Sequence, residues 1–199
     1  MSGRWLTVVA LASLMLVVAG LWIPAKAMLA QELLEMAWAE SRARQTDAKP
    51  WPWADTWPVA RLALPDEDLS WIVMDGVHGE SLAFGPGLVR TGDHGPVMIA
   101  GHRDTHFRAL EAMAAGTRLQ LQQRDGQWQD YQVASIRIVD SRQEGVDLNA
   151  LGPDGLLLVT CYPFDSLNTN GPLRYVVEAQ RVTTAVPEVA SVAHAVTDS

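Results

Sequence analysis

From residue 59 to residue 182 the chain is a succession of short segments rich in β-branched, leucine and aromatic residues, and this pattern most limits the folds open to it. Strand composition recurs at residues 59–64, 69–74, 97–100, 117–123, 127–139, 156–161 and 173–182. Only two short helices fit between these segments, at residues 105–115 and 147–151. Seven or eight strands with so little helix predict a mainly β domain, built as a closed or nearly closed barrel.

Two local details of the strand pattern predict how neighbouring strands meet. Asp125-Gly126 lies between two strand segments and is typical of a tight hairpin turn. In the long segment 127–139, apolar residues are odd-numbered at Tyr131 and Val133 but even-numbered at Ile136. Because side chains alternate between faces of a strand, this change of phase predicts a β-bulge near residues 134–135.

The N-terminus carries 18 uncharged residues, 6–23. As a helix this segment would extend about 27 Å, just enough to span a bilayer. A cleaved signal peptide is the alternative, with Ala25-Lys26-Ala27 as the cleavage site. We favour a retained membrane anchor over residues 1–26, because the apolar run is longer than a typical signal core and Lys26 falls inside the site. Under either interpretation, the rest of the chain is exported from the cytoplasm.

Residues 27–58 connect this anchor to the strand-rich domain. Residues 27–44 are helix-forming and predict a juxtamembrane helix, whereas residues 49–58 contain three prolines and three tryptophans. This second part is either an aromatic anchor at the lipid headgroups or an extended arm whose indoles pack on the domain, and we favour the arm. Residues 183–199 show no periodicity and predict a flexible tail.

Charge and cysteine content exclude some classes of protein. The net charge is −8 and no basic run occurs, so we expect no nucleic-acid partner. The single cysteine cannot form an internal disulfide, so an exported domain would have to fold by packing alone.

That cysteine, Cys161, ends the apolar run 156–160, where a strand would meet a loop. It is either a small core residue or a nucleophile presented at a strand end. A nucleophilic thiol needs a partner that favours the thiolate and later protonates a leaving amine, and His102, which follows an apolar strand and Gly101, could serve. Arg174, thirteen residues after the cysteine, could stabilise an oxyanion.

His102, Asp104 and His106 could instead be imagined as metal ligands. Gly101 suggests, however, that a helix begins after His102, which would point the two imidazoles in different directions. We therefore expect no metal site and no cofactor. Arg103, Asp104 and Arg108 are interpreted as helix-start and surface charges.

Together these residues resemble the sortase family of cysteine transpeptidases over residues 59–182. The resemblance is carried by Leu158-Val159-Thr160-Cys161, the upstream strand-Gly-His and the arginine at plus thirteen. The family pattern around the nucleophile is TLxTC, and here Leu157 replaces the first threonine. Segments 100–105 and 50–56, with the acidic balance, are similar in particular to the sortases of Gram-negative proteobacteria.

The resemblance implies a closed eight-stranded β-barrel tethered to the inner membrane, with its catalytic domain in the periplasm. Cys161 would attack an LPxTG-like signal near the C-terminus of an exported protein, and a thioacyl-enzyme would then pass the acyl group to an amine. His102 would be the acid and Arg174 the oxyanion partner. Substrate-binding positions would include Leu158, Thr160 and Phe164, and the loop 165–172 would line the groove. The acceptor amine and any modulation by calcium, known in some relatives, stay open.

Two other functions compete with this one. An L,D-transpeptidase of the cell wall is also β-rich, but it would normally show His and Gly directly before the nucleophile, where Val159 and Thr160 stand. A membrane-anchored interaction domain without activity would bury an inert Cys161.

Overall fold

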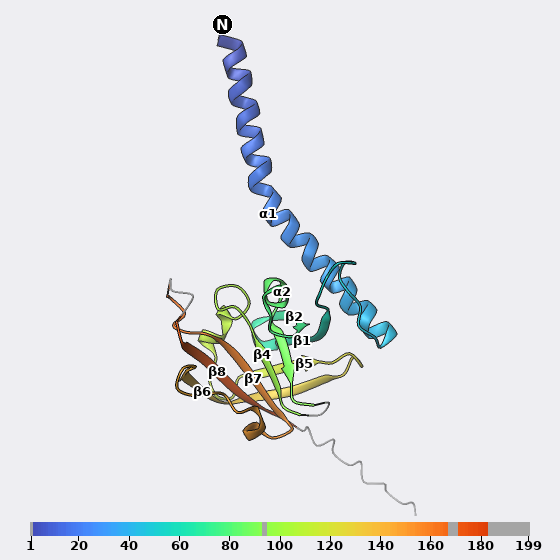
Figure 1. Cartoon of the computed structure of the whole chain (residues 1–199), viewed down its shortest axis with the longest axis vertical. Coiled ribbons are helices and arrows are strands. Elements are labelled where there is room, and N and C mark those ends of the chain that lie inside the picture. The colour runs from blue at the N-terminus through green and yellow to red at the C-terminus, as the bar shows by residue number, and fades with distance from the viewer. Residues whose placement is uncertain (1, 93–94, 167–170, 183–199) are drawn as a thin grey trace, which may run out of the picture.

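Eight strands form a closed barrel in the computed structural model, which describes residues 2–92, 95–166 and 171–182 (Figure 1). The strands are β1 (Pro58–Leu64), β2 (Leu69–Asp75), β3 (Gly87–Arg90), β4 (Val97–Ala100), β5 (Arg118–Gln122), β6 (Trp128–Asp140), β7 (Gly155–Cys161) and β8 (Leu173–Arg181). Around the barrel they follow the order β1-β2-β3-β4-β7-β8-β6-β5, with parallel pairs β2/β3 and β4/β7. The predicted closed eight-stranded barrel is confirmed.

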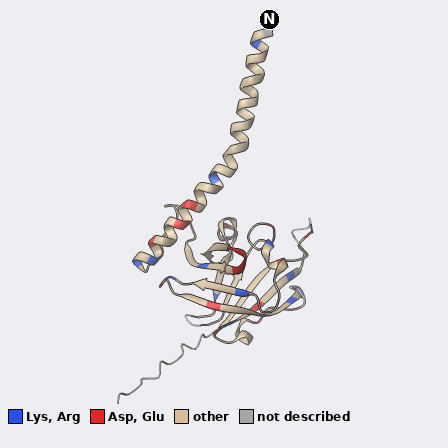
Figure 2. Cartoon of the chain, turned by 180° about the vertical axis from the view of Figure 1, so that it is seen from behind, with Lys and Arg blue, Asp and Glu red and all other residues tan. Residues whose placement is uncertain are grey.

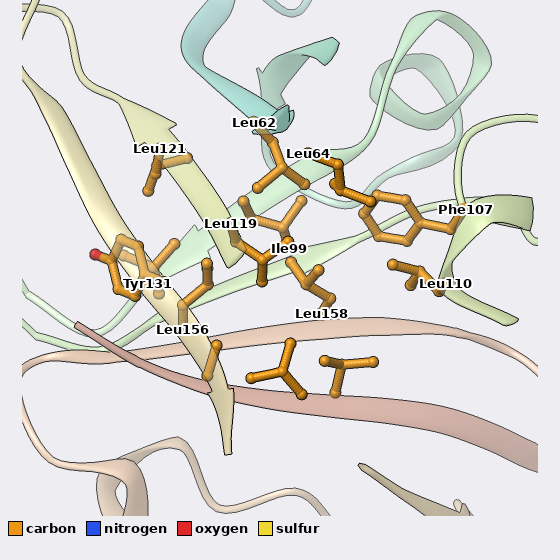
Figure 3. Close-up of a cluster of buried hydrophobic side chains, with 14 of the residues drawn as sticks. Leu62, Leu64, Ile99, Phe107, Leu110, Leu119, Leu121, Tyr131, Leu156 and Leu158 are labelled. Atoms are coloured by element: carbon orange, nitrogen blue, oxygen red, sulfur yellow. The ribbon is translucent and has the colours of Figure 1, made fainter. Parts of the chain in front are cut away.

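The barrel interior is filled by leucine, isoleucine and aromatic side chains from nearly every strand. Figure 3 shows Leu62, Ile99, Leu119 and Leu158 converging with Phe107, which comes from the loop after β4. All five are fully buried. Packing in this core fixes the carboxyl ends of β4 and β7. The candidate site residues lie at these two strand ends.

Two local predictions hold in detail. The register between β6 and β8 shifts between Val133 and Ser135, which is the predicted β-bulge. Strands β5 and β6 pair antiparallel through a turn in which Gly126 has a φ of +86° and Asp125 accepts a hydrogen bond from the amide of Gln127. A positive φ is the conformation that glycine adopts without steric cost.

Other elements differ from the expectation. Strand β3 and the short helix α2 (Gly79–Phe84) were not predicted, because each has at most six residues and too few apolar positions to show a period. The helix expected at residues 105–115 is wrong. The chain makes turns there, followed by the 3-10 helix η2 (Arg108–Ala112). Its composition is helical, but Phe107 and Leu110 are drawn into the barrel core, which breaks the helical path. Two further 3-10 helices are η1 (Pro65–Glu67) and η3 (Leu148–Leu151).

Residues 2–44 form one continuous helix, α1 (Ser2–Arg44), which passes through Pro24 without a break. Its N-terminal part projects away from the barrel and carries no charged side chain between Arg4 and Lys26 (Figure 2). It is long and apolar enough to cross a membrane. Its C-terminal part lies against β1 and β2, where Leu34 and Trp38 are buried with side chains of β2.

The proline- and tryptophan-rich arm lies next to α2. Trp51 meets the ring of Phe84 edge-on, with ring centroids 4.8 Å apart. Ala54 and Thr56 are buried, whereas Trp53 is 79% exposed. Only part of the arm therefore packs on the domain. The tail expected at residues 183–199 lies outside the described residues.

Candidate active site

Strand pairing places Arg174 directly across from Cys161. The two residues are partners in the antiparallel register of β7 and β8. Side chains of such partners stand on the same face, with Cβ atoms about 4.5–5.5 Å apart. The guanidinium is held by Nη1, which donates to the carbonyl oxygens of Gly171 at 2.7 Å and Leu173 at 2.9 Å. The pairing of β7 with β8 thus brings together two residues that lie thirteen positions apart in the sequence.

His102 comes to the same edge of the barrel through the parallel pair β4/β7. Ala100 is the register partner of Val159, and the amide of Gly101 continues the ladder by donating to the Val159 carbonyl at 3.1 Å. The hydroxyl of Thr160 then donates to the Gly101 carbonyl at 2.7 Å. Since the carboxyl ends of parallel strands meet at one edge, His102 and Cys161 leave their strands side by side.

The loop that carries His102, residues 101–107 and here called the His102 loop, is tightly folded. The carbonyl of His102 accepts hydrogen bonds from the amides of His106 at 3.1 Å and Phe107 at 3.0 Å. The ring of Phe107 packs on Gly101 so closely that a Cβ there would lie 2.9 Å from it. Glycine is therefore required before the histidine. His102 itself is exposed, so a substrate can reach its imidazole.

The three side chains predicted to bind substrate are all buried. Leu158 is 0% exposed and belongs to the barrel core, and Thr160 is 2% exposed with its hydroxyl bonded to Gly101. These two side chains support the strand that ends at Cys161, and substrate binding at positions 158 and 160 stays a prediction. Phe164 is also buried, at 4% exposed.

Phe164 belongs to an aromatic cluster beside Cys161. Its ring meets Tyr175 at 5.0 Å and Tyr162 at 6.2 Å between centroids, and the two tyrosines stack at 6.1 Å. Burial raises the pKa of Tyr175 above its ordinary value. This cluster forms an apolar wall at the strand end that carries the thiol. Of the loop 165–172, residues 167–170 lie outside the described residues.

The acidic and basic residues near His102 differ from the sequence interpretation. Arg103 is a buried residue, only 4% exposed, rather than a surface charge. Its guanidinium donates to both carboxylate oxygens of Asp104, at 2.8 Å and 3.0 Å, and so holds the pKa of that carboxyl below its usual range.

Among the described residues, no group of three His, Cys, Asp or Glu side chains could hold a metal ion.

His106 lies beside His102 and is partly buried. The two imidazole rings stack with centroids 6.3 Å apart. Burial, and secondly the nearby His102, lower the pKa of His106 below its ordinary value. Burial therefore favours the neutral form of His106 beside the ring of His102.

Sequence reasoning missed that Arg103 and Arg108 bind the backbone after Cys161. Arg103 donates to the carbonyls of Pro163 and Ser166, and Arg108 donates to that of Phe164, each at 2.7 Å. The only signal in the sequence is that both arginines flank a candidate catalytic histidine. Nothing in the pattern indicates that either side chain turns toward the barrel.

Residues 62–182 match a family model described as the sortase domain. Over 126 residues the chain is 29% identical to Sortase D of Bacillus subtilis, covering 61% of this chain and 63% of that protein. The matched region is thus less than two thirds of that relative's length.

Two solved structures show the same fold. Sortase A from Corynebacterium diphtheriae superposes with a TM-score of 0.54 at 23% identity, covering 68% of this chain and 66% of the other. A Clostridium perfringens Sortase D5 transpeptidase gives 0.56 at 17% identity, covering 78% and 99%.

Proposed function

The chain belongs to the sortase family, and we propose that it is a membrane-anchored cysteine transpeptidase in which Cys161, His102 and Arg174 carry the chemistry. The observation that supports these roles is the strand register. It brings a thiol, an imidazole-bearing loop and a guanidinium from three separate segments to one edge of the barrel. The thiol is partly exposed, unlike the buried, inert cysteine expected of a silent interaction domain.

The reaction follows from these positions. The Cys161 thiolate attacks the carbonyl carbon before the scissile bond of an LPxTG-like signal, and the carbonyl electrons move to an oxyanion that Arg174 stabilises. The C–N bond breaks as His102 donates a proton to the departing amine, which leaves a thioester on Cys161. An incoming amine, deprotonated by His102, then attacks the thioester, forms a new amide and releases the thiolate.

We also propose that α1 is retained as a membrane anchor. The helix runs without interruption through residues 25–27, where a signal peptidase would cut, and its C-terminal part packs on the barrel. The carboxyl end of β7 and the start of β8 lie on the side of the barrel from which the N-terminal half of α1 projects (Figure 1). A site on that side would face an exported substrate still held in the same membrane.

The sorting reaction is tested with the full chain in detergent and a library of LPxTG-like peptides, with a second peptide as amine donor. We expect a thioacyl-enzyme by intact mass spectrometry and a transpeptidation product, both lost in Cys161→Ala. A matched control is Ser135→Ala, which changes a small polar residue on β6 away from the thiol. No acyl-enzyme with any peptide, together with a Cys161 inert to thiol reagents, would favour the silent domain.

We further propose, from segments 50–56 and 100–105, that the chain is a sortase of the Gram-negative type with its barrel in the periplasm. A phosphatase reporter fused after residue 182 should be active, and membranes washed with carbonate should retain the protein. An inactive reporter, or release into the wash, contradicts the anchored periplasmic topology.

A further inference from the structure

We propose that Arg103, assisted by Arg108, is a positioning residue that clamps the loop after Cys161 to the His102 loop and so sets the geometry between thiol and imidazole. The loop after Cys161 means residues 162–166, here called the Cys161 loop. The proposal deepens the sortase reaction proposed above and rests on it for the role of the site.

Arg103 is almost completely enclosed, with its side chain 3% exposed, while its partner Asp104 is 60% exposed. Removing a guanidinium from water is costly unless its donors are paired. Four hydrogen bonds pair them. Two go to the carboxylate of Asp104, and one each goes to the carbonyls of Pro163 and Ser166. A buried cation is thus held by the backbone of another segment rather than by its local neighbour alone.

Arg108, the first residue after the His102 loop, adds a second attachment. Its Nη1 donates to the Phe164 carbonyl at 2.7 Å, its Nη2 lies 3.0 Å from a carboxylate oxygen of Asp165, and its guanidinium sits 5.9 Å from the centre of the Phe164 ring. This side chain is half exposed, so its ion pairs contribute less than the buried Arg103 bonds. The two arginines together hold residues 163–166 at three carbonyl oxygens.

The position of the clamp explains why it is needed. The ladder between β4 and β7 ends at Ala100 and Val159, and the bond from Thr160 to Gly101 is the last link before the reactive residues. Beyond this bond the segments that follow β4 and β7 separate into two loops. The bonds from Arg103 reach across 60 and 63 residues of sequence just after this divergence and join the loops again. His102 and Cys161 therefore lie between two fixed crosslinks.

The charge of Arg103 also bears on the sulfur. The pKa of Arg103 is raised, first by its hydrogen bonds to Asp104, and the attraction of a Cys161 thiolate contributes to the rise. The charge of the buried guanidinium therefore lies close enough to Cys161 to interact with it electrostatically. A lysine at this position would keep the charge but lose the planar fork that reaches two carbonyls at once.

Arg103→Lys and Arg103→Gln separate geometry from charge. In Arg103→Lys we expect kcat for acyl-enzyme formation to fall roughly 100-fold with KM nearly unchanged, because a displacement of about 1 Å between reacting groups costs that much. The rate at which iodoacetamide alkylates Cys161 at pH 7 should stay near the wild-type value in Arg103→Lys and fall severalfold in Arg103→Gln. Hydrogen exchange of residues 163–166 should accelerate in both variants.

Arg142→Gln is the matched control. Arg142 makes the same two-bond contact with a neighbouring carboxylate, Asp140, but it is 72% exposed and lies on the connection after β6. All readouts should stay at the wild-type level in this variant.

The clamp is overturned if either Arg103 variant keeps kcat while only its Tm falls, or if KM rises at constant kcat. Unchanged exchange at residues 163–166 in both Arg103 variants also overturns it. Alkylation and exchange need no peptide substrate. If the wild-type chain cleaves no sorting peptide but the Arg103 variants still loosen residues 163–166, the sortase proposal fails while the clamp stands.

Discussion

At the residue scale, the role proposed for Arg174 depends on a fixed orientation as well as on charge. Arg174 is the register partner of Cys161 on the adjacent strand, and its Nη1 donates hydrogen bonds to two carbonyls. We predict that Arg174→Lys keeps the fold but lowers kcat about 10²–10³-fold, because an ammonium cannot keep the two carbonyl contacts of Nη1 and also donate to the proposed oxyanion. The measurement is single-turnover acylation. Arg181→Lys, at the other end of the same strand, is the control. Equal rates in all three proteins would remove Arg174 from the mechanism.

The lowered pKa of His106 makes the stability of the folded chain depend on pH. Burial, and then the neighbouring His102, hold its pKa below the ordinary 6.5, so the unfolded chain binds this proton more readily than the folded one. The stabilisation that comes from a neutral His106 is therefore present above about pH 6.5 and is lost as the pH falls through the lowered folded pKa. We predict that His106→Gln loses less stability than the wild type between pH 7.5 and pH 5, as measured by Tm. A wild-type loss equal to that of the variant would contradict this prediction.

At the scale of elements, α1 is fused to the barrel by one buried face. Leu34 and Trp38 are 0% and 1% exposed, while Met36 on the opposite face is 59% exposed. Ion pairs from Glu35 to Arg61 and from Asp47 to Arg124 flank the buried face. The half of α1 near the barrel therefore belongs to the folded domain and is not a flexible stalk.

This packing predicts unequal effects for two substitutions on one helix. Trp38→Ala should reduce the free energy of unfolding by about 3–5 kcal/mol, since a large buried ring leaves a cavity. Met36→Ala should change it by less than about 0.5 kcal/mol. Urea unfolding of a chain that begins at residue 27 measures both. Similar values for the two variants would mean that α1 is not docked in solution.

At the scale of the whole molecule, a single helix joins the apolar segment that we propose spans the membrane to the barrel. Because α1 does not end between them, it would set both the height and the rotation of the active site relative to the bilayer. A seven-residue helical insertion after residue 28 would lift the barrel by about 10 Å with a turn of only about 20°.

We predict that this insertion lowers processing of a membrane-held substrate but leaves cleavage of a soluble peptide unchanged. The two activities are compared in the same liposomes. A two-residue insertion, which rotates the barrel by about 200° and lifts it by only about 3 Å, tests whether rotation matters separately from height. If membrane-held and soluble substrates respond alike to the seven-residue insertion, α1 acts as a simple tether.

The sequence by itself determined the β class, the bulge near residue 134 and the hairpin at Asp125, and it also led to the prediction of three catalytic residues. These follow from local rules, because alternation, turn composition and strand-end position are properties of neighbouring residues. Strand β3, helix α2 and the interruption of the helix at residues 105–115 did not follow, since short elements take their form from the core they cover.

Only the tertiary structure decided what surrounds the three candidate catalytic residues. It showed that Leu158 and Thr160 support the strand from inside, and that Arg103 turns inward to bind carbonyls 60 residues away. An arginine next to an aspartate looks like an ordinary surface pair in a sequence, because the pattern does not record which distant backbone lies within reach of its donors. Closure of the barrel brings that backbone into place, and the direction of the side chain follows from it.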